Sequence, residues 1–139
     1  MKTIARWIDG MAFEAELDGH KIVIDAEEQF GGKDRGPRPK GLTLVSLIGC
    51  TGMDVVSLLY KMKVPFENFD VEAHTELTDK HPKVFKDIEI QYTFYGKDLE
   101  QYKDKIEKAV RLSQERYCGV SEMLRKNSNI TYKIILKEK

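Results

Sequence analysis

The chain has 139 residues, with 23 basic and 23 acidic side chains and a formal net charge of zero. This length suits one domain, and a hydrophobic fraction of 41% is enough for a core and argues against disorder. The balanced charge argues against a general nucleic-acid binder, which usually carries a basic excess. The first residues lack the apolar stretch of a signal peptide, so we expect a single cytoplasmic domain over residues 1–139.

Three strands are predicted at the start of the chain. Residues 3–9, 11–17 and 21–25 carry strand patterns separated by Asp-Gly turns, which predict an antiparallel meander. Residues 27–41 then contain four glycines and two prolines, which interrupt regular structure. A loop of this length is usually functional or disordered, and this one carries a positive cluster made of Lys33, Arg35, Arg38 and Lys40.

Residues 42–63 predict the central helix. Apolar positions occupy almost its whole circumference, which is typical of a buried helix rather than a surface one. The segment approaches the length of a membrane span, but Asp54 near the middle would cost about 3 kcal/mol in a bilayer. We therefore interpret it as a buried helix of a protein without membrane contact. Gly49 and Gly52 flank Cys50 and leave room for another group to approach the backbone.

The second half of the chain predicts two strands, two helices and a last strand. Alternating apolar residues predict a hairpin from residues 69–77 and 85–94 and a final strand at 130–136. An amphipathic pattern predicts a helix over residues 98–117 and a short one over 122–126. The predicted fold is therefore α+β, in the order βββ–α–ββ–αα–β.

The two cysteines, Cys50 and Cys118, lie 68 residues apart. No CxxC or HExxH motif accompanies them, and the scattered His20, His74 and His81 are interpreted as strand and turn residues. A structural zinc site usually draws four nitrogen or sulfur ligands from close pairs. The sequence alone therefore gives little support to metal binding.

Each cysteine has a structural and a chemical interpretation. Cys50 lies in the most apolar helix, where a free cysteine is usually an inert packing group. Cys118 begins a short helix, with Arg116 and Arg125 nearby in the sequence, and a helix N-terminus and a guanidinium both favour a thiolate. Cys118 is thus the more reactive cysteine on these grounds, although a simple linker residue is equally compatible.

Asp54 follows Cys50 by one helical turn on the same face, where a carboxylate would raise the pKa of the thiol. We expect Asp54 to cap the helix or to pair with a basic residue such as Arg35. The aromatic residues Tyr92, Phe94 and Tyr117 are interpreted as core.

Residues 36–56 carry Gly-Pro-Arg-Pro before the helix and Gly-Cys-Thr-Gly around Cys50. This segment resembles the central helix of the OsmC/Ohr family (osmotically inducible protein C and organic hydroperoxide resistance proteins). Residues 116–121, RYCGVS, are similar to its Cys-Pro-Val-Ser segment, with Gly119 where proline is common. The order of predicted elements also agrees from end to end. The resemblance implies an intertwined homodimer with the site at the subunit boundary.

The resemblance implies a thiol-dependent peroxidase. Cys50 would be the peroxidatic cysteine, attacking an organic hydroperoxide to release an alcohol and leave a sulfenic acid. Cys118 would be the resolving cysteine, forming a disulfide with Cys50 that protects it from further oxidation. A lipoyl or thioredoxin-like dithiol would then reset the pair. The resemblance implies no metal, flavin or haem cofactor, and the charge balance and Asp54 predict no nucleic-acid or membrane partner.

A cation is needed to make a thiolate of a buried thiol. Arg38 is the first candidate because its guanidinium forms a planar fork that keeps its charge, so that it would hold both a thiolate and a peroxide oxygen. Arg35 is the reserve and Arg6 a weaker third candidate. If Arg38 activates Cys50, the thiol should titrate well below the usual pKa of about 8.5.

The chain departs from the family pattern just before the central helix. Family members carry a glutamate there that orients the arginine, whereas this chain has Lys40 and Gly41. Glu27 and Glu28 are the candidates to replace this glutamate beside the arginine. This departure favours one alternative function, a protein that binds an apolar small molecule with little peroxidase turnover. A third possibility is a redox sensor that acts through the disulfide between Cys50 and Cys118 and needs a partner surface.

Overall fold

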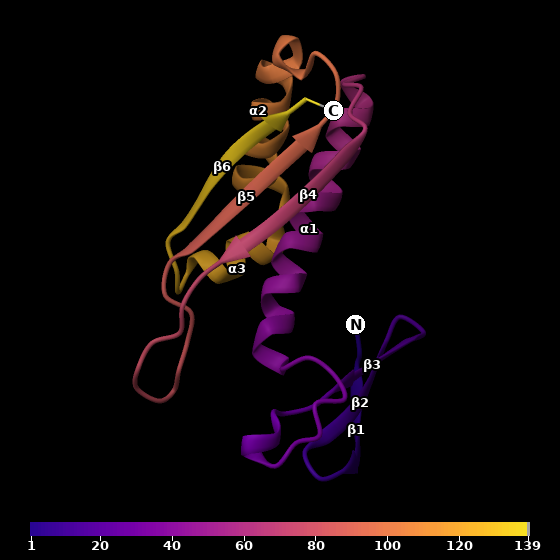
Figure 1. The fold of residues 1–139 in the computed structure, drawn as a ribbon, viewed down its shortest axis with the longest axis vertical. Coiled ribbons are helices and arrows are strands. Elements are labelled where there is room, and N and C mark those ends of the chain that lie inside the picture. Colours follow the sequence, from indigo (N-terminus) through magenta and orange to yellow (C-terminus); the bar gives the residue numbers. More distant parts are fainter. Residues whose placement is uncertain (139) are drawn as a thin grey trace. The chain divides into compact units, whose positions relative to one another are not determined.

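The computed structural model describes residues 1–138 and has an α+β fold with two three-stranded sheets (Figure 1). The chain forms two compact units, one from Met1 to Val45 and the other from Ser46 onward. The helices and strands follow the predicted order, with short 3₁₀ and π segments added to it.

The first unit contains the predicted meander. Strands β1 (Ile4–Asp9), β2 (Ala12–Leu17) and β3 (His20–Ile24) pair antiparallel in that order. The second hairpin turns through Asp18 and Gly19, with φ values of 52° and 78°. An Asp-Gly pair adopts this left-handed geometry at little cost, which is why the sequence marks the turn so clearly.

The loop after β3 is ordered rather than open. It contains a short 3₁₀ helix, η1 (Glu28–Phe30), and it closes around the buried carboxylate of Asp25, which accepts hydrogen bonds from three backbone N–H groups and from Arg35 Nε. At Gly36 a Cβ atom would lie 2.0 Å from the carbonyl oxygen of Val23, so only glycine fits this close approach.

Helix α1 (Pro39–Lys61) begins three residues before the predicted start. Proline suits the first position of a helix because its missing N–H has no partner there. The helix has the length and apolar composition of a membrane span, a test that core helices also pass. Its buried side chains form one stripe, made of Leu47, Thr51, Val55 and Leu59, whereas Met53 is 77% exposed. The prediction of a helix buried on all sides is therefore wrong for the single chain, which covers only the stripe at four-residue spacing.

The second unit contains the second sheet. Strands β4 (Asn68–His74) and β5 (Ile88–Tyr95) form the predicted antiparallel pair, and β6 (Ile130–Lys137) lies parallel to β5 on its other side. Both hairpin strands are shorter at the turn end than predicted, and the residues between them retain one isolated bridge, Leu77–Phe85. Parallel pairing needs a long crossover, which the helices between β5 and β6 supply.

The predicted helix over residues 98–117 is three segments. They are the 3₁₀ helix η2 (Leu99–Tyr102), the α-helix α2 (Lys103–Leu112) and the π-helix η3 (Ser113–Tyr117). The short helix that follows, α3 (Gly119–Arg125), begins three residues before its predicted start. These helices and the second part of α1 lie against one face of the sheet, as Figure 1 shows. The other face is polar; there the Tyr95 hydroxyl, for example, donates to Asp70 at 3.0 Å.

Candidate functional site

The fold brings the two cysteines together. Cys50 lies midway along α1, and Cys118 lies between η3 and α3. Their Sγ atoms and a carboxylate oxygen of Asp54 all lie within 4.8 Å of one another. Both cysteines are free thiols; Cys118 is buried and Cys50 is half-buried. Residues that are distant in the sequence thus form one cluster with two sulfurs and one carboxylate.

The first turn of α3 supplies backbone donors to both sulfurs. The N–H of Cys118 donates to the carbonyl of Ser113 at 2.8 Å, closing the π segment, and its Sγ caps α3 by accepting from the N–H of Ser121 at 3.4 Å. The N–H of Val120 donates to Cys50. Single π turns often occur at functional sites, and this one sets the position of Cys118.

The surroundings of Cys50 favour the neutral thiol. Burial raises the pKa of Cys50, the N–H of Val120 lowers it, and the neighbouring Cys118 and Asp54 raise it further. The predicted effect of the Asp54 carboxylate is therefore confirmed. Among the described residues, the groups that shift the pKa of Cys50 include no arginine or other cation, so the lowered thiol pKa expected from an arginine is not found.

A one-way chain of hydroxyl hydrogen bonds holds Asp54. Ser113 Oγ donates to Asp54 Oδ2 at 3.0 Å. A hydroxyl has one hydrogen, so Ser113 must accept from Thr51 Oγ1, 2.7 Å away, and Thr51 must accept from the Tyr92 hydroxyl, also 2.7 Å away. Burial raises the pKa of Tyr92 to about 12, which keeps this first donor protonated.

Gln114 and Arg125 complete this network. Gln114 Nε2 donates to the Tyr92 hydroxyl at 2.8 Å and to Thr51 Oγ1 at 3.1 Å, and Arg125 Nη2 donates to the Gln114 carbonyl at 2.8 Å. The prediction of Tyr92 as core is confirmed, but its hydroxyl has this further role. Sequence reasoning missed the network, although a polar Thr51 on the buried stripe of an apolar helix is the signal that marks it.

The candidate arginines all lie in the first unit, where each faces a carboxylate: Arg6 with Glu16 at 3.2 Å, Arg35 with Asp9 at 2.6 Å, and Arg38 with Asp34 at 2.6 Å. The expected pair between Arg35 and Asp54 is wrong. Arg35 bridges Asp9 and Asp25, and Asp54 is held by a serine hydroxyl in the second unit.

The carboxylate partner of Arg38 is Asp34, rather than Glu27 or Glu28. Arg38 Nη1 also donates to the carbonyl of Gly36 at 2.9 Å, which fixes the guanidinium to the loop that precedes α1. The role of Arg38 at Cys50 stays a prediction.

Two hollows lie near the cysteines: one borders Asp54, and the other borders the part of α1 around Cys50. A small one of about 310 Å³ is lined by Asp54, Ser57, Leu58, Lys61 and Tyr117. Tyr117 is 52% exposed, so its assignment to the core is wrong; the Arg116 guanidinium lies over its ring, 5.8 Å from the centroid. A second, apolar groove of about 530 Å³ is lined by Ile48, Gly49, Gly52, Met53, Val56, Ser57, Tyr60, Phe69 and Val71.

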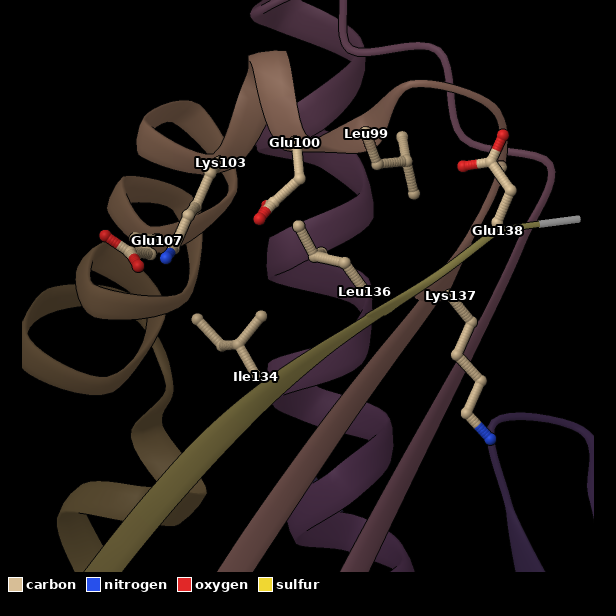
Figure 2. Close-up of a pocket in the computed structure, with 9 residues that line it drawn as sticks. Leu99, Glu100, Lys103, Glu107, Ile134, Leu136, Lys137 and Glu138 are labelled. Carbon is tan, nitrogen blue, oxygen red and sulfur yellow. The ribbon is translucent and has the colours of Figure 1, made fainter.

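A third pocket, of about 370 Å³, contains neither cysteine (Figure 2). It is lined by residues of η2, α2 and the end of β6, with Leu99, Ile134 and Leu136 inside and charged side chains such as Glu100 and Lys103 around them. Cys50, Cys118 and Asp54, which we call the dithiol cluster, do not border this pocket, so the pocket is not part of the candidate site.

Comparisons with known proteins agree with this structure. Residues 31–133 match the family described as OsmC-like protein. The chain is 32% identical to Protein YhfA of Escherichia coli (strain K12) over 133 residues, which are 95% of each chain. A hypothetical protein from Aquifex aeolicus VF5 has a similar structure, with a TM-score of 0.85, 28% identity and coverage of 99% of this chain and 96% of that one.

The fold is shared with more distant proteins. The organic hydroperoxide resistance protein OhrB of Bacillus subtilis superposes with a TM-score of 0.64 and 20% identity, covering 96% of each chain. At this identity the likeness shows the fold alone. The match over residues 31–133 and the relative that is 32% identical along almost the whole chain show that this protein belongs to the OsmC-like family.

Proposed function

We propose that the protein is a thiol-dependent peroxidase that reduces organic hydroperoxides to alcohols. The observation that carries the proposal is the cluster itself: the sulfurs of Cys50 and Cys118 lie within 4.8 Å in a chain that belongs to the OsmC-like family. A disulfide forms when two sulfurs approach to about 2.05 Å, so a small movement joins this pair.

The proposed cycle has three balanced steps. The Cys50 thiolate attacks the outer oxygen of the hydroperoxide, the O–O bond breaks, and the alcohol leaves with a proton. The resulting Cys50 sulfenic acid then condenses with the Cys118 thiol, releasing water and forming the disulfide. A lipoyl or thioredoxin-like dithiol returns both thiols by exchange and becomes a disulfide itself.

The first step needs a positive charge near Cys50. Burial, Cys118 and Asp54 raise the pKa of this thiol, so the described chain by itself leaves it mostly protonated at neutral pH. We assign this charge to Arg38, whose guanidinium is already oriented by Asp34. The proposal also includes a cytoplasmic homodimer of single OsmC-like domains.

A second candidate function is the binding of an apolar small molecule. The groove of about 530 Å³ beside α1 and the raised pKa of Cys50 favour it. Stabilisation by an apolar ligand that survives the change Cys50→Ser would support this function, since binding alone needs no thiol.

The deciding experiment follows both thiols after one equivalent of cumene hydroperoxide is added to reduced, chelator-treated protein. We expect rapid loss of two thiols and a mass decrease of two hydrogens. Cys118→Ser should stop at the sulfenic acid, and Cys50→Ser should not react. Arg38→Ala should move the pH profile of thiol loss to higher pH, because the thiolate loses its cation.

Slow thiol loss, no faster than that of a free cysteine, would contradict the peroxidase. An unchanged pH profile in Arg38→Ala, with Arg111→Ala at an exposed position of α2 as the matched control, would eliminate Arg38 as the activator but leave the roles of the two cysteines intact.

A further inference from the structure

The dithiol cluster has the donor set of a metal site. Two sulfurs and one carboxylate oxygen lie within 4.8 Å of one another, at Cys50, Cys118 and Asp54. Thiolates select thiophilic ions, and zinc accepts mixed sulfur and carboxylate ligands in a tetrahedral arrangement. The sequence alone concealed this set because its members come from two helical segments that are far apart in the chain.

The spacing suits one ion. Zinc lies about 2.3 Å from a sulfur ligand and about 2.0–2.2 Å from a carboxylate oxygen. Two sulfurs on a tetrahedral ion are therefore roughly 3.8 Å apart. The donors of the cluster reach this spacing if they move by about 1 Å, within the range that side-chain rotation provides.

The groups around the donors are those that support metal thiolates. The N–H of Val120 lowers the pKa of the Cys50 thiol, and the N–H of Ser121 donates to Cys118 Sγ at 3.4 Å. Ser113 Oγ donates to Asp54 Oδ2, which leaves Oδ1 for an ion and fixes the carboxylate, as hydrogen bonds commonly do for metal ligands.

The buried hydroxyl of Ser121, next to Cys118, makes no hydrogen bond with the described residues. Ser121 Oγ is fully buried and has no hydrogen-bond partner among the described residues. Its own N–H contacts Cys118 Sγ. An unsatisfied buried hydroxyl costs free energy, and a water or other ligand in the fourth position of a metal ion would supply a partner.

We propose that Cys50, Cys118 and Asp54 bind one thiophilic divalent cation, represented by Zn²⁺. Binding replaces the protons of the two thiols, so two protons leave for each ion bound. Both sulfurs then share their electron pairs with the metal, and the ion blocks attack on a peroxide until it is removed. The site does not depend on the proposed peroxidase, although both use the same sulfurs.

The test is a titration of the reduced, metal-free 139-residue chain with Co²⁺, followed by competition with Zn²⁺. We expect one Co²⁺ per chain, a near-ultraviolet thiolate-to-cobalt charge-transfer band, tetrahedral d–d bands, and displacement of all of them by Zn²⁺. Cys50→Ser and Cys118→Ser should each lose the dithiolate signature. Asp54→Asn should weaken binding, whereas Asp104→Asn, an exposed site on α2, should not. Ser113→Ala should weaken it by about 10- to 100-fold because the carboxylate loses its orientation.

Absence of a thiolate charge-transfer band, or Co²⁺ binding that is the same in both serine variants, would overturn the metal site. Peroxide turnover measured separately in the chelator-treated protein distinguishes the two proposals. Turnover without cobalt binding overturns the metal site alone, and cobalt binding without turnover overturns the peroxidase alone.

Discussion

The number of hydroxyl hydrogens determines the direction of the hydrogen bonds in the polar network near the cysteines. Because each hydroxyl has one hydrogen, the contact of Ser113 with Asp54 fixes the direction of the bonds that reach it from Thr51 and Tyr92. A second serine at this site, Ser121, differs from Ser113 because its Oγ is buried and has no hydrogen-bond partner in the described residues. The two serines are matched in burial, both at 0% exposure.

This difference predicts opposite outcomes for the same substitution. Ser113→Ala should lower the free energy of unfolding by about 1–3 kcal/mol, because Thr51 and Asp54 lose a buried partner. Ser121→Ala should leave it unchanged or raise it by up to about 1 kcal/mol, because the removed hydroxyl has no partner. Urea denaturation of both variants measures the difference, and an equal loss in the two would contradict the network.

At the scale of elements, the loop between β3 and α1 depends on one carboxylate. Burial raises the pKa of Asp25, but hydrogen bonds from the backbone of Ala26, Arg35 and Lys33 and from the Arg35 side chain outweigh it and lower the pKa from 3.8 to about 2. A carboxylate with a lowered pKa stabilises the folded state above its unfolded pKa. This contribution should therefore be complete above about pH 4 and should disappear as the pH falls to about 2.

The prediction concerns Asp25→Asn. This variant should be less stable at neutral pH and should lose less stability than the native protein between about pH 4 and about pH 2. Trp7, the only tryptophan of the chain, lies in β1 and reports unfolding of the first unit by its fluorescence. Asp18→Asn, at an exposed hairpin turn, is the control that should keep the native pH dependence. Parallel pH curves for Asp25→Asn and the native protein would refute the role of this carboxylate.

At the scale of the whole molecule, the apolar surface of α1 exceeds what one chain covers. Met53 and Tyr60 are 77% and 70% exposed, and both line the groove of about 530 Å³. Exposed apolar surface of this kind is typical of an interface. It agrees with the proposed homodimer, in which a second copy would cover the face that the described chain leaves open.

Met53→Glu should therefore weaken the dimer at least about tenfold, because it places a charge in an apolar contact. Met123→Glu, at a 65% exposed methionine outside the groove, is the matched control and should leave the dimer intact. Sedimentation velocity over a range of concentrations measures both. A native protein that stays monomeric, or a dimer that tolerates Met53→Glu as well as the control, would argue against this interface.

The sequence by itself determined the order of the elements and the identity of the two cysteines. Strand alternation, Asp-Gly turns and helical periodicity are local signals, so they place β1 to β6 and the main helices to within a few residues. The raised thiol pKa expected from Asp54 was also available, because one helical turn joins it to Cys50. The motifs around both cysteines carried the family resemblance.

Only the tertiary structure decided which distant groups meet. Parallel pairing joins β5 and β6, and packing brings Cys118 to Cys50 and Asp54, although these residues are far apart in the chain. The chain of hydrogen bonds that runs from Tyr92 through Thr51 and Ser113 to Asp54 also joins distant residues. The choice of Asp34 for Arg38, and of Asp9 and Asp25 for Arg35, likewise depended on how the loop closes. Local patterns state which face of an element is apolar, but contacts across the fold depend on packing, which no short stretch of sequence specifies.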